Sequence, residues 1–213
     1  MKSFNGSLTN SAFAAAVLCL LQFDSAAAVE SYKRLVGEEP EQPAGSDPNC
    51  ANQAKSAGTI ITYYDPESEK VNVVSTLKDG SFAGWGWGGG MTNTEMVIFE
   101  TNGSSSAISF HYGVGDDYPP EDSALAACYD TSIVENGDGT ITLTATRPLE
   151  CSGITDYGGG SFVVQLDTEM DLCMAWNPDE GSLSFHDGNL KSFSQMLSSE
   201  GTCSAIVEVN KDP

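Results

Sequence analysis

The sequence predicts an all-β protein, an antiparallel immunoglobulin-like β-sandwich with short helical turns. The chain carries short runs of β-branched and aromatic residues, and these runs are separated by turn residues and not by helical patterns. The alternation is cleanest over 140–146, where Ile141, Leu143 and Ala145 share one face and threonines occupy the other. Strands at this spacing are typical of two antiparallel sheets packed face to face.

Each expected strand is bounded by turn residues. The first stops at Asp65-Pro66, the second stops at Lys78-Asp79-Gly80, and Asn136-Gly137-Asp138-Gly139 precedes the strand at 140–146. The expected strands lie at 59–64, 71–77, 96–99, 107–112, 133–134, 140–146, 162–166, 172–176 and 206–209. Short helices are expected only around 123–128 and 190–197.

The first 28 residues are predicted to be a signal peptide, so we expect a secreted protein. Lys2 precedes an apolar stretch at 12–21, and Ala26-Ala27-Ala28 provides a small-residue cleavage site. This stretch is too short to span a bilayer, which requires about 20 apolar residues. A buried core helix is the alternative interpretation. Residues 29–54 are expected to form a flexible acidic lead-in and 55–209 the sandwich.

The charge excludes two classes of partner. The 213 residues include 30 Asp and Glu against 9 Lys and Arg, a formal net charge of −21. Nucleic acid and anionic membrane surfaces both require a basic footprint, which this chain lacks. The pair Lys33-Arg34 is either a dibasic processing site or two solvated charges.

The cysteine count suggests disulfides. Six cysteines are present, and the first, Cys19, belongs to the expected signal peptide, so five remain. Two disulfides and one thiol are the simplest arrangement in an oxidising compartment, and the spacing leaves the connectivity open. With no CxxC and two histidines, the sequence argues against a zinc site. Asn102-Gly103-Ser104 is a glycosylation sequon in an expected turn, and an unused sequon is the alternative.

The most unusual segment is Gly-Trp-Gly-Trp-Gly-Gly-Gly-Met at 84–91. It lacks the Gly-Lys-Ser/Thr of a phosphate loop, and its tryptophans argue against a flexible linker. We interpret it as a wall where a large planar ligand meets the backbone. A second segment, 175–188, contains His186, and Met91 and His186 together offer a thioether and an imidazole. This is a ligand pair of low-spin haem iron in electron carriers.

These two segments resemble the haem-binding branch of the DOMON family, which is similar to the cytochrome domain of cellobiose dehydrogenase. The resemblance rests on 84–91 with the apolar strand 96–99, and on Ala175-Trp176 followed by Phe185-His186-Asp187-Gly188. It covers roughly residues 55–195. It implies a non-covalently bound haem b with Met91 and His186 as axial ligands. The other residues that it assigns to the cofactor site are Trp85, Trp87, Trp176 and Arg147.

The implied chemistry is electron transfer without catalysis. If protein ligands fill both axial positions, the iron has no open position for substrate, so the module would not itself be an enzyme. Covalent c-type attachment is excluded because the sequence has no Cys-x-x-Cys-His. We expect a monomer, without a membrane span, that meets a redox partner protein carrying a basic docking face.

Several alternatives stay open. His111 is expected to be structural, but it would complete a bis-His site if Met91 were not a ligand. The same sandwich without haem could bind a carbohydrate or another small ligand on its tryptophans, and an inert structural domain is a weaker possibility. The acidic run at 115–122 is better explained as a solvated loop than as a calcium site.

Overall fold

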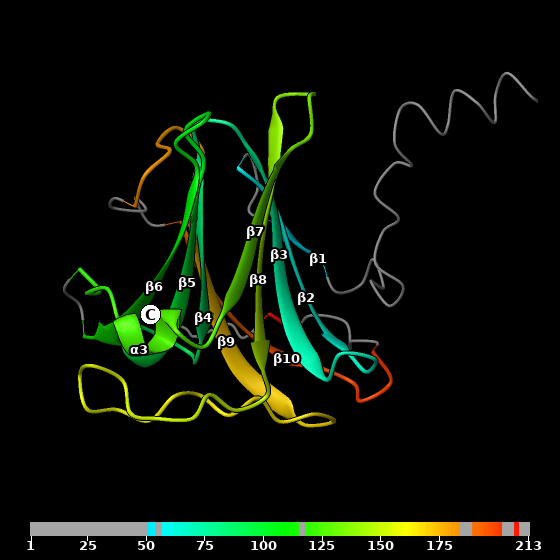
Figure 1. The fold of residues 1–213 in the computed structure, drawn as a ribbon, viewed down its shortest axis with the longest axis vertical. Helices are drawn as coiled ribbons and strands as arrows, with labels where there is room; N and C mark the ends of the chain where they lie inside the picture. Colours follow the sequence, from blue (N-terminus) through cyan, green and yellow to red (C-terminus); the bar gives the residue numbers. More distant parts are fainter. Residues whose placement is uncertain (1–50, 54–56, 116–117, 184–188, 202–206, 209–213) are drawn as a thin grey trace, which may run out of the picture. The chain divides into compact units, whose positions relative to one another are not determined.

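The computed structural model describes residues 51–53, 57–115, 118–183, 189–201 and 207–208, which form two antiparallel β-sheets packed face to face (Figure 1). Sheet A contains, in spatial order, β1 (Ala51–Gln53), β2 (Gly58–Asp65), β3 (Lys70–Lys78), β8 (Thr140–Pro148) and β7 (Asp130–Glu135). Sheet B contains β11 (Val207–Glu208), β10 (Leu190–Met196), β9 (Glu169–Asn177), β4 (Phe82–Trp87), β5 (Thr92–Glu100) and β6 (Ala107–Val114). The predicted all-β sandwich is therefore confirmed.

The core lies between the sheets. On β8, Ile141, Leu143 and Ala145 are buried and alternate with half-buried threonines, as the sequence pattern predicts. Arg147 continues the same inward-facing row. The facing side of sheet B contributes aromatic and aliphatic side chains from its central strands, so one apolar layer holds the two sheets together.

Strand β4 lies in the middle of sheet B, between β5 and β9, and all six of its residues are buried. Because successive side chains on a strand point to opposite faces, Trp85 and Trp87 lie on the core side. Gly84 and Gly86 therefore lie on the outer side. This strand is not among those expected from the sequence, which suggested a ligand wall at 84–91.

The structure corrects two expected elements. Residues 190–196 form strand β10 and not a helix, because Phe193 and Gln195 are buried with a period of two and the segment pairs with β9. The segment 162–166 is no regular strand; it has one bridge, between Leu166 and Leu197. Its Val164 N–H donates to the carbonyl of Leu149 at 2.8 Å.

The first strand and the one helical turn lie in segments for which the sequence gives expectations. β1 lies inside the range 29–54 that was expected to be a flexible lead-in. The expected helix around 123–128 is one short turn, α3 (Ser123–Ala126), whose N-cap Asp122 accepts from the N–H groups of Ala124 and Leu125. Residues 1–28 lie outside the described part, and so does the Lys33-Arg34 pair. Among the described residues, no helix is long and apolar enough to cross a membrane.

One disulfide joins Cys128 to Cys151. It connects the segment after α3 with the long loop between β8 and β9. Cys173 is a buried thiol on β9, whereas Cys50 and Cys203 lie outside the described residues. Asn102 of the sequon is exposed in the turn between β5 and β6, and its glycosylation stays a prediction.

Candidate functional site

The candidate site is the outer side of sheet B, here called the glycine face. It is defined by Gly84 and Gly86 of β4, Met96 and Ile98 of β5, and Cys173 of β9. The register places these residues on one side of the sheet, since Gly84 lies opposite Ile98, and Gly86 lies between Met96 and Cys173. The face is therefore apolar and has two glycines at its centre.

Both glycines are required by close packing. A Cβ on Gly84 would lie 2.9 Å from Ile98 Cδ1, and a Cβ on Gly86 would lie 2.5 Å from the sulfur of Cys173. Neither glycine has a positive φ, so the requirement is steric and not conformational. The absence of these two side chains lets Ile98 and Cys173 pack over the middle of this face.

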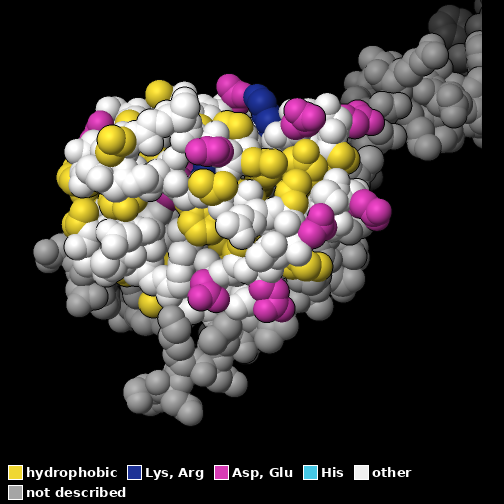
Figure 2. All heavy atoms as spheres, turned by 90° about the horizontal axis from the view of Figure 1, so that it is seen from below, with side chains coloured by type: hydrophobic (Ala, Val, Ile, Leu, Met, Phe, Trp, Pro, Cys, Tyr) yellow, Lys and Arg dark blue, Asp and Glu magenta, His cyan; other side chains and the backbone are white. Residues whose placement is uncertain are grey.

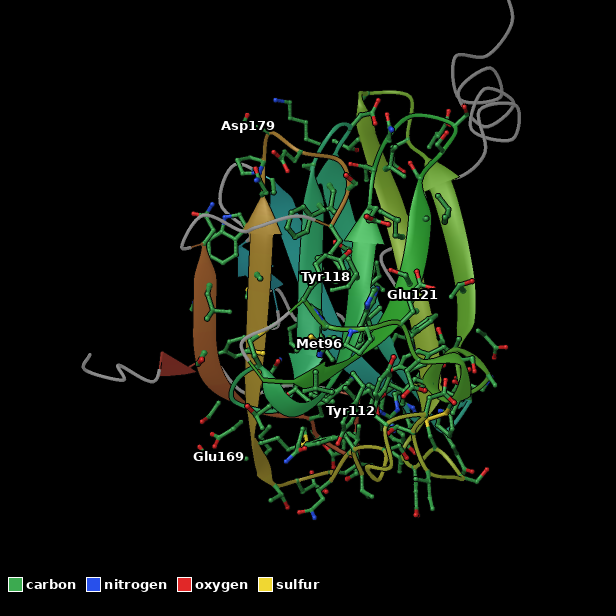
Figure 3. All side chains as sticks on the ribbon, turned by 90° about the vertical axis from the view of Figure 1, so that its left-hand side faces the viewer. Met96, Tyr112, Tyr118, Glu121, Glu169 and Asp179 are labelled. Carbon is green, nitrogen blue, oxygen red and sulfur yellow. A yellow bond between two sulfur atoms is a disulfide. The ribbon has the colours of Figure 1, made fainter. Side chains whose placement is uncertain are left out.

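The glycine face is buried although it lies outside the core. Met96, Ile98 and Cys173 are all buried. Figure 3 views the molecule from this side and shows Met96 and Tyr118 near its centre. Tyr118 is 63% exposed, and its ring meets the ring of His111 edge-on at a centroid distance of 6.4 Å. Tyr118 thus belongs to the outer rim of the site.

Met91 lies at one end of the glycine face, in the turn between β4 and β5, and is half-buried. Its carbonyl accepts from the N–H of Gly115 at 3.2 Å and lies so close to Gly113 that a Cβ there would be 2.2 Å away. On the other side of the turn, Ser192 Oγ donates to the carbonyl of Gly89 at 3.1 Å. The turn is therefore held against both β6 and β10.

The segment that carries His186 starts from the other end of the same face. Residues 184–188 lie outside the described part of the chain, but both flanks are described. The N–H of Leu183 donates to the carboxylate of Glu100, at the end of β5, and Trp176 N–H donates to the carbonyl of Asn189 at 3.1 Å. Because β4 and β9 are antiparallel, the β9–β10 connection and the Met91 turn lie at opposite ends of sheet B.

The three predicted tryptophans lie in the core. Trp85 and Trp87 are 0% exposed and Trp176 is 3% exposed, and all three pack between the sheets, on the opposite side of sheet B from the glycine face. Trp85 and Trp87 meet edge-on at 5.8 Å. The strict Gly-Trp alternation of β4 already contained this signal, since a period of two separates glycines and tryptophans onto opposite faces.

Arg147 also lies between the sheets and is fully buried. It forms an ion pair with Glu95 of β5, which is 1% exposed. Tyr129 donates to the same Glu95 oxygen at 2.5 Å and accepts from Trp87 Nε1 at 3.0 Å. Burial, and then the charge of Glu95, hold the pKa of Tyr129 well above its ordinary value, so the phenol keeps the proton that it donates. Sequence reasoning missed Glu95 and Tyr129.

His111 has a structural role in this arrangement. It is buried on β6, next to Met96, and its Nδ1 lies 2.8 Å from the carbonyl of Pro119. Because that carbonyl can only accept, Nδ1 donates to it, and Nε2 lies 2.9 Å from the Ser109 hydroxyl oxygen. Nδ1 thus holds the segment 118–121 to β6, while the contact of Nε2 lies within β6.

The described residues contain no cluster of three or more His, Cys, Asp or Glu side chains that could hold a metal ion. In the acidic run 115–122, Asp122 caps α3 and accepts from the N–H of Asp156 at 2.9 Å. Residues 116 and 117 of the run lie outside the described part of the chain.

Comparison with known proteins shows a relationship at the level of the fold. No family model and no curated protein matches the sequence. The structure is similar to the cytochrome domain of cellobiose dehydrogenase from Myriococcum thermophilum, with a TM-score of 0.52, 13% sequence identity, and coverage of 74% of this chain and 88% of that domain. The chain has the fold of that cytochrome domain.

A second solved structure is the cytochrome b domain of pyranose dehydrogenase from Coprinopsis cinerea. Its TM-score is 0.48 at 14% identity, with coverage of 70% of this chain and 84% of that domain. At these identities the likeness concerns the fold alone and does not extend to the roles of single side chains.

Proposed function

We propose that the protein is a haem b-binding electron-transfer module that holds its haem on the glycine face, with Met91 and His186 as the axial ligands. The observation that carries this proposal is the placement of the Met91 turn and the flanks of the His186 segment at opposite ends of one buried, apolar face. Met91 and His186 would hold the haem iron from these two ends.

The length of β5 and the reach of the chain from Leu183 to His186 are compatible with such a site. Along β5, the six residue steps from Thr94 to Glu100 correspond to about 20 Å. His186 is three residues beyond Leu183, which is anchored at Glu100, and three residues extend to at most about 10 Å. The imidazole can therefore reach the middle of the glycine face from the end opposite Met91.

The residues present also suit the chemistry of the group. Haem b supplies a one-electron Fe(III)/Fe(II) couple, and a thioether ligand favours the reduced state relative to a second imidazole. Gly84 and Gly86 allow the side chains of Ile98 and Cys173 to pack close to the strand, and the buried Met96 and Ile98 would give the haem an apolar contact. With both axial positions filled by protein, we infer that the chain passes electrons and does not catalyse a reaction itself.

The residues on the core side of sheet B would support the site indirectly. Trp85 and Trp87 fill the core side of β4, so they fix the strand that carries the glycines. Trp176 and Arg147 also lie on the core side, so in this proposal all four side chains support the strands and do not touch a haem on the glycine face. Secretion, a monomeric state and a partner with a basic docking face also belong to this proposal.

The carbohydrate-binding alternative is less well supported by the structure. A sugar platform needs exposed aromatic rings, and the three tryptophans of the chain are all buried. Failure of the protein to bind haemin stoichiometrically would nevertheless favour a haem-free module.

The proposal is tested by titrating the full-length or signal-free protein with haemin and recording ferric and dithionite-reduced spectra. We expect a six-coordinate, low-spin haem whose Soret band shifts on reduction. Met91→Ala and His186→Ala should each give a five-coordinate or weakly bound haem, whereas Met170→Leu, a core methionine on β9, should not. If His111→Gln loses the spectrum and His186→Ala retains it, the ligand assignment is wrong.

A further inference from the structure

We propose that a buried network around Glu95 is the positioning device for Met91. The network, here called the Glu95 clamp, consists of Trp87, Glu95, Tyr129, Arg147 and the backbone of Phe162. The claim that the clamp positions an iron ligand rests on the proposed function, in which Met91 binds the haem iron. Its effect on the position of Met91 can be measured in haem-free protein as well.

The clamp holds both stems of the Met91 turn. Trp87 and Glu95 form the last paired position of the β4–β5 hairpin, and Met91 lies midway between them along the chain. Trp87 donates through Nε1 to Tyr129, and Tyr129 donates to Glu95. One phenol therefore joins the end of the incoming strand to the start of the outgoing one.

The same carboxylate ties the hairpin to the opposite sheet. Arg147 of β8 donates to Glu95 Oε1, and its other terminal nitrogen donates to the carbonyl of Phe162 at 2.5 Å. The N–H of Phe162 donates to Glu95 Oε2 at 3.0 Å. Both carboxylate oxygens are thus used, and the hairpin, β8 and the 149–168 loop meet at one side chain.

The chemistry of the clamp suggests a role in specifying position. A buried ion pair is a poor source of net stability, because well-packed apolar residues of similar volume often serve as well or better. Directed hydrogen bonds to a buried charge, however, allow only one arrangement of the segments that provide them. The opposite end of the hairpin shows the contrast: the buried Thr101 hydroxyl there makes only neutral hydrogen bonds, with Ser81 and the carbonyl of Lys78.

Tyr129→Phe is the most selective test of the clamp. It removes the acceptor of Trp87 and one donor to Glu95, but it keeps the aromatic ring that stacks on Phe110 at 4.4 Å and lies 5.6 Å from the Arg147 guanidinium. Glu95→Gln is a second, stronger variant. Thr101→Val is the matched control, since it removes buried hydrogen bonds from the far end of the same hairpin.

The first readout is the Met91 methyl resonance in haem-free protein labelled with [13C-methyl]methionine, assigned with Met91→Leu. We expect this resonance to shift and broaden in Tyr129→Phe and Glu95→Gln, and to stay unchanged in Thr101→Val at a comparable loss of Tm. An unchanged Met91 resonance in both clamp variants would overturn the proposal and leave the network a purely structural one.

The second readout is the sulfur-to-iron charge-transfer band of the ferric haem-loaded protein. We expect the clamp variants to lose part of this band while Thr101→Val retains it. A band present in the wild type but unaffected by both clamp variants would also overturn the clamp. If the wild type lacks the band while the methyl resonance responds to Tyr129→Phe, the ligand role of Met91 fails but the positioning role stands.

Discussion

Gly86 lies at a point of sheet B where a side chain would meet the sulfur of Cys173. The same strand carries Trp85 and Trp87 on its core side, so β4 presents bulk to one face and none to the other. At the residue scale, this alternation makes room for Ile98 and Cys173 on the glycine face, and it explains why glycine is needed within a strand, where it is normally unfavourable.

Gly86→Ala should lower the free energy of unfolding by about 1–3 kcal/mol, the usual range for overpacking a tight site. The new Cβ would lie 2.5 Å from Cys173 Sγ and 2.9 Å from Thr94 Cγ2, so one strand must shift. Urea unfolding measures the loss, and haemin titration should show weaker binding. Gly90→Ala is the control, because its Cβ would meet nothing within 4 Å; an equal effect of both would contradict this account.

Asp138 provides a prediction on pH. Its carboxylate accepts from the hydroxyl of Thr140 at 2.6 Å and from the Thr140 N–H at 2.9 Å, and these bonds lower its pKa below the ordinary value for Asp. A lowered pKa in the folded state contributes stability that is complete above the ordinary pKa and is lost as the pH falls through the lowered one.

Asp138→Ala should therefore destabilise the protein at neutral pH, and its effect should shrink as the pH falls through the lowered pKa and the carboxyl of the wild type becomes protonated. Urea midpoints of both proteins across this range check the prediction. A difference that does not change with pH would show that the charge of Asp138 does not contribute to the stability of the turn.

At the element scale, the strands with clear periodicity were predictable and those decided by tertiary contacts were not. Ile141, Leu143 and Ala145 alternate in the sequence and line the core as expected. The segment 190–196 contains polar and apolar residues that suit either a helix or a strand, and its pairing with β9 decides for the strand. The segment 162–166 has strand-like composition, but its N–H groups are used to hold the Glu95 carboxylate and Leu149.

The disulfide between Cys128 and Cys151 also acts at this scale. It closes a loop with a sequence separation of 23 residues around β7 and β8. In the chain-entropy model, such a loop contributes about 3 kcal/mol by restricting the unfolded chain. We expect the double variant Cys128→Ser, Cys151→Ser to lose about this amount in urea unfolding, and a loss below about 1 kcal/mol would contradict that mechanism.

The candidate site was predictable only in part, because some of its residues are brought together by tertiary contacts and not by a local pattern. Met91 and His186 carry unusual local context, so the sequence identified them as candidate ligands. The local context of Glu95 is not unusual, because an acid within the strand Thr92–Glu100 looks like any solvated charge. Only the packing of β8 against sheet B brings Arg147 to it, and no local pattern encodes that contact.

At the scale of the whole molecule, the net charge of −21 dominates the surface. Figure 2 shows carboxylate side chains distributed around apolar patches on the lower face of the sandwich. The long loop between β8 and β9 contributes the exposed side chains of Ile154, Tyr157 and Val163. Such a surface should attract a basic protein and repel an acidic one.

Electron transfer to a small basic redox protein should therefore slow by about tenfold or more when salt is raised from about 0.01 M to about 0.5 M, because screening shortens the range of attraction from about 30 Å to a few ångströms. Stopped-flow mixing of the reduced protein with the acceptor measures this rate. An uncharged quinone is the control and should show little dependence on salt. Equal salt dependence for both acceptors would indicate that the acidity serves solubility alone.

The most direct test of the central claim is the near-infrared magnetic circular dichroism spectrum of the ferric protein after addition of one equivalent of haemin. The proposed site predicts the charge-transfer signal of a low-spin haem with one methionine and one histidine ligand, and its loss in both Met91→His and His186→Ala. A bis-histidine signal in the wild type, a high-spin signal, or no stoichiometric binding of haemin would contradict the proposal that Met91 and His186 hold a haem on the glycine face.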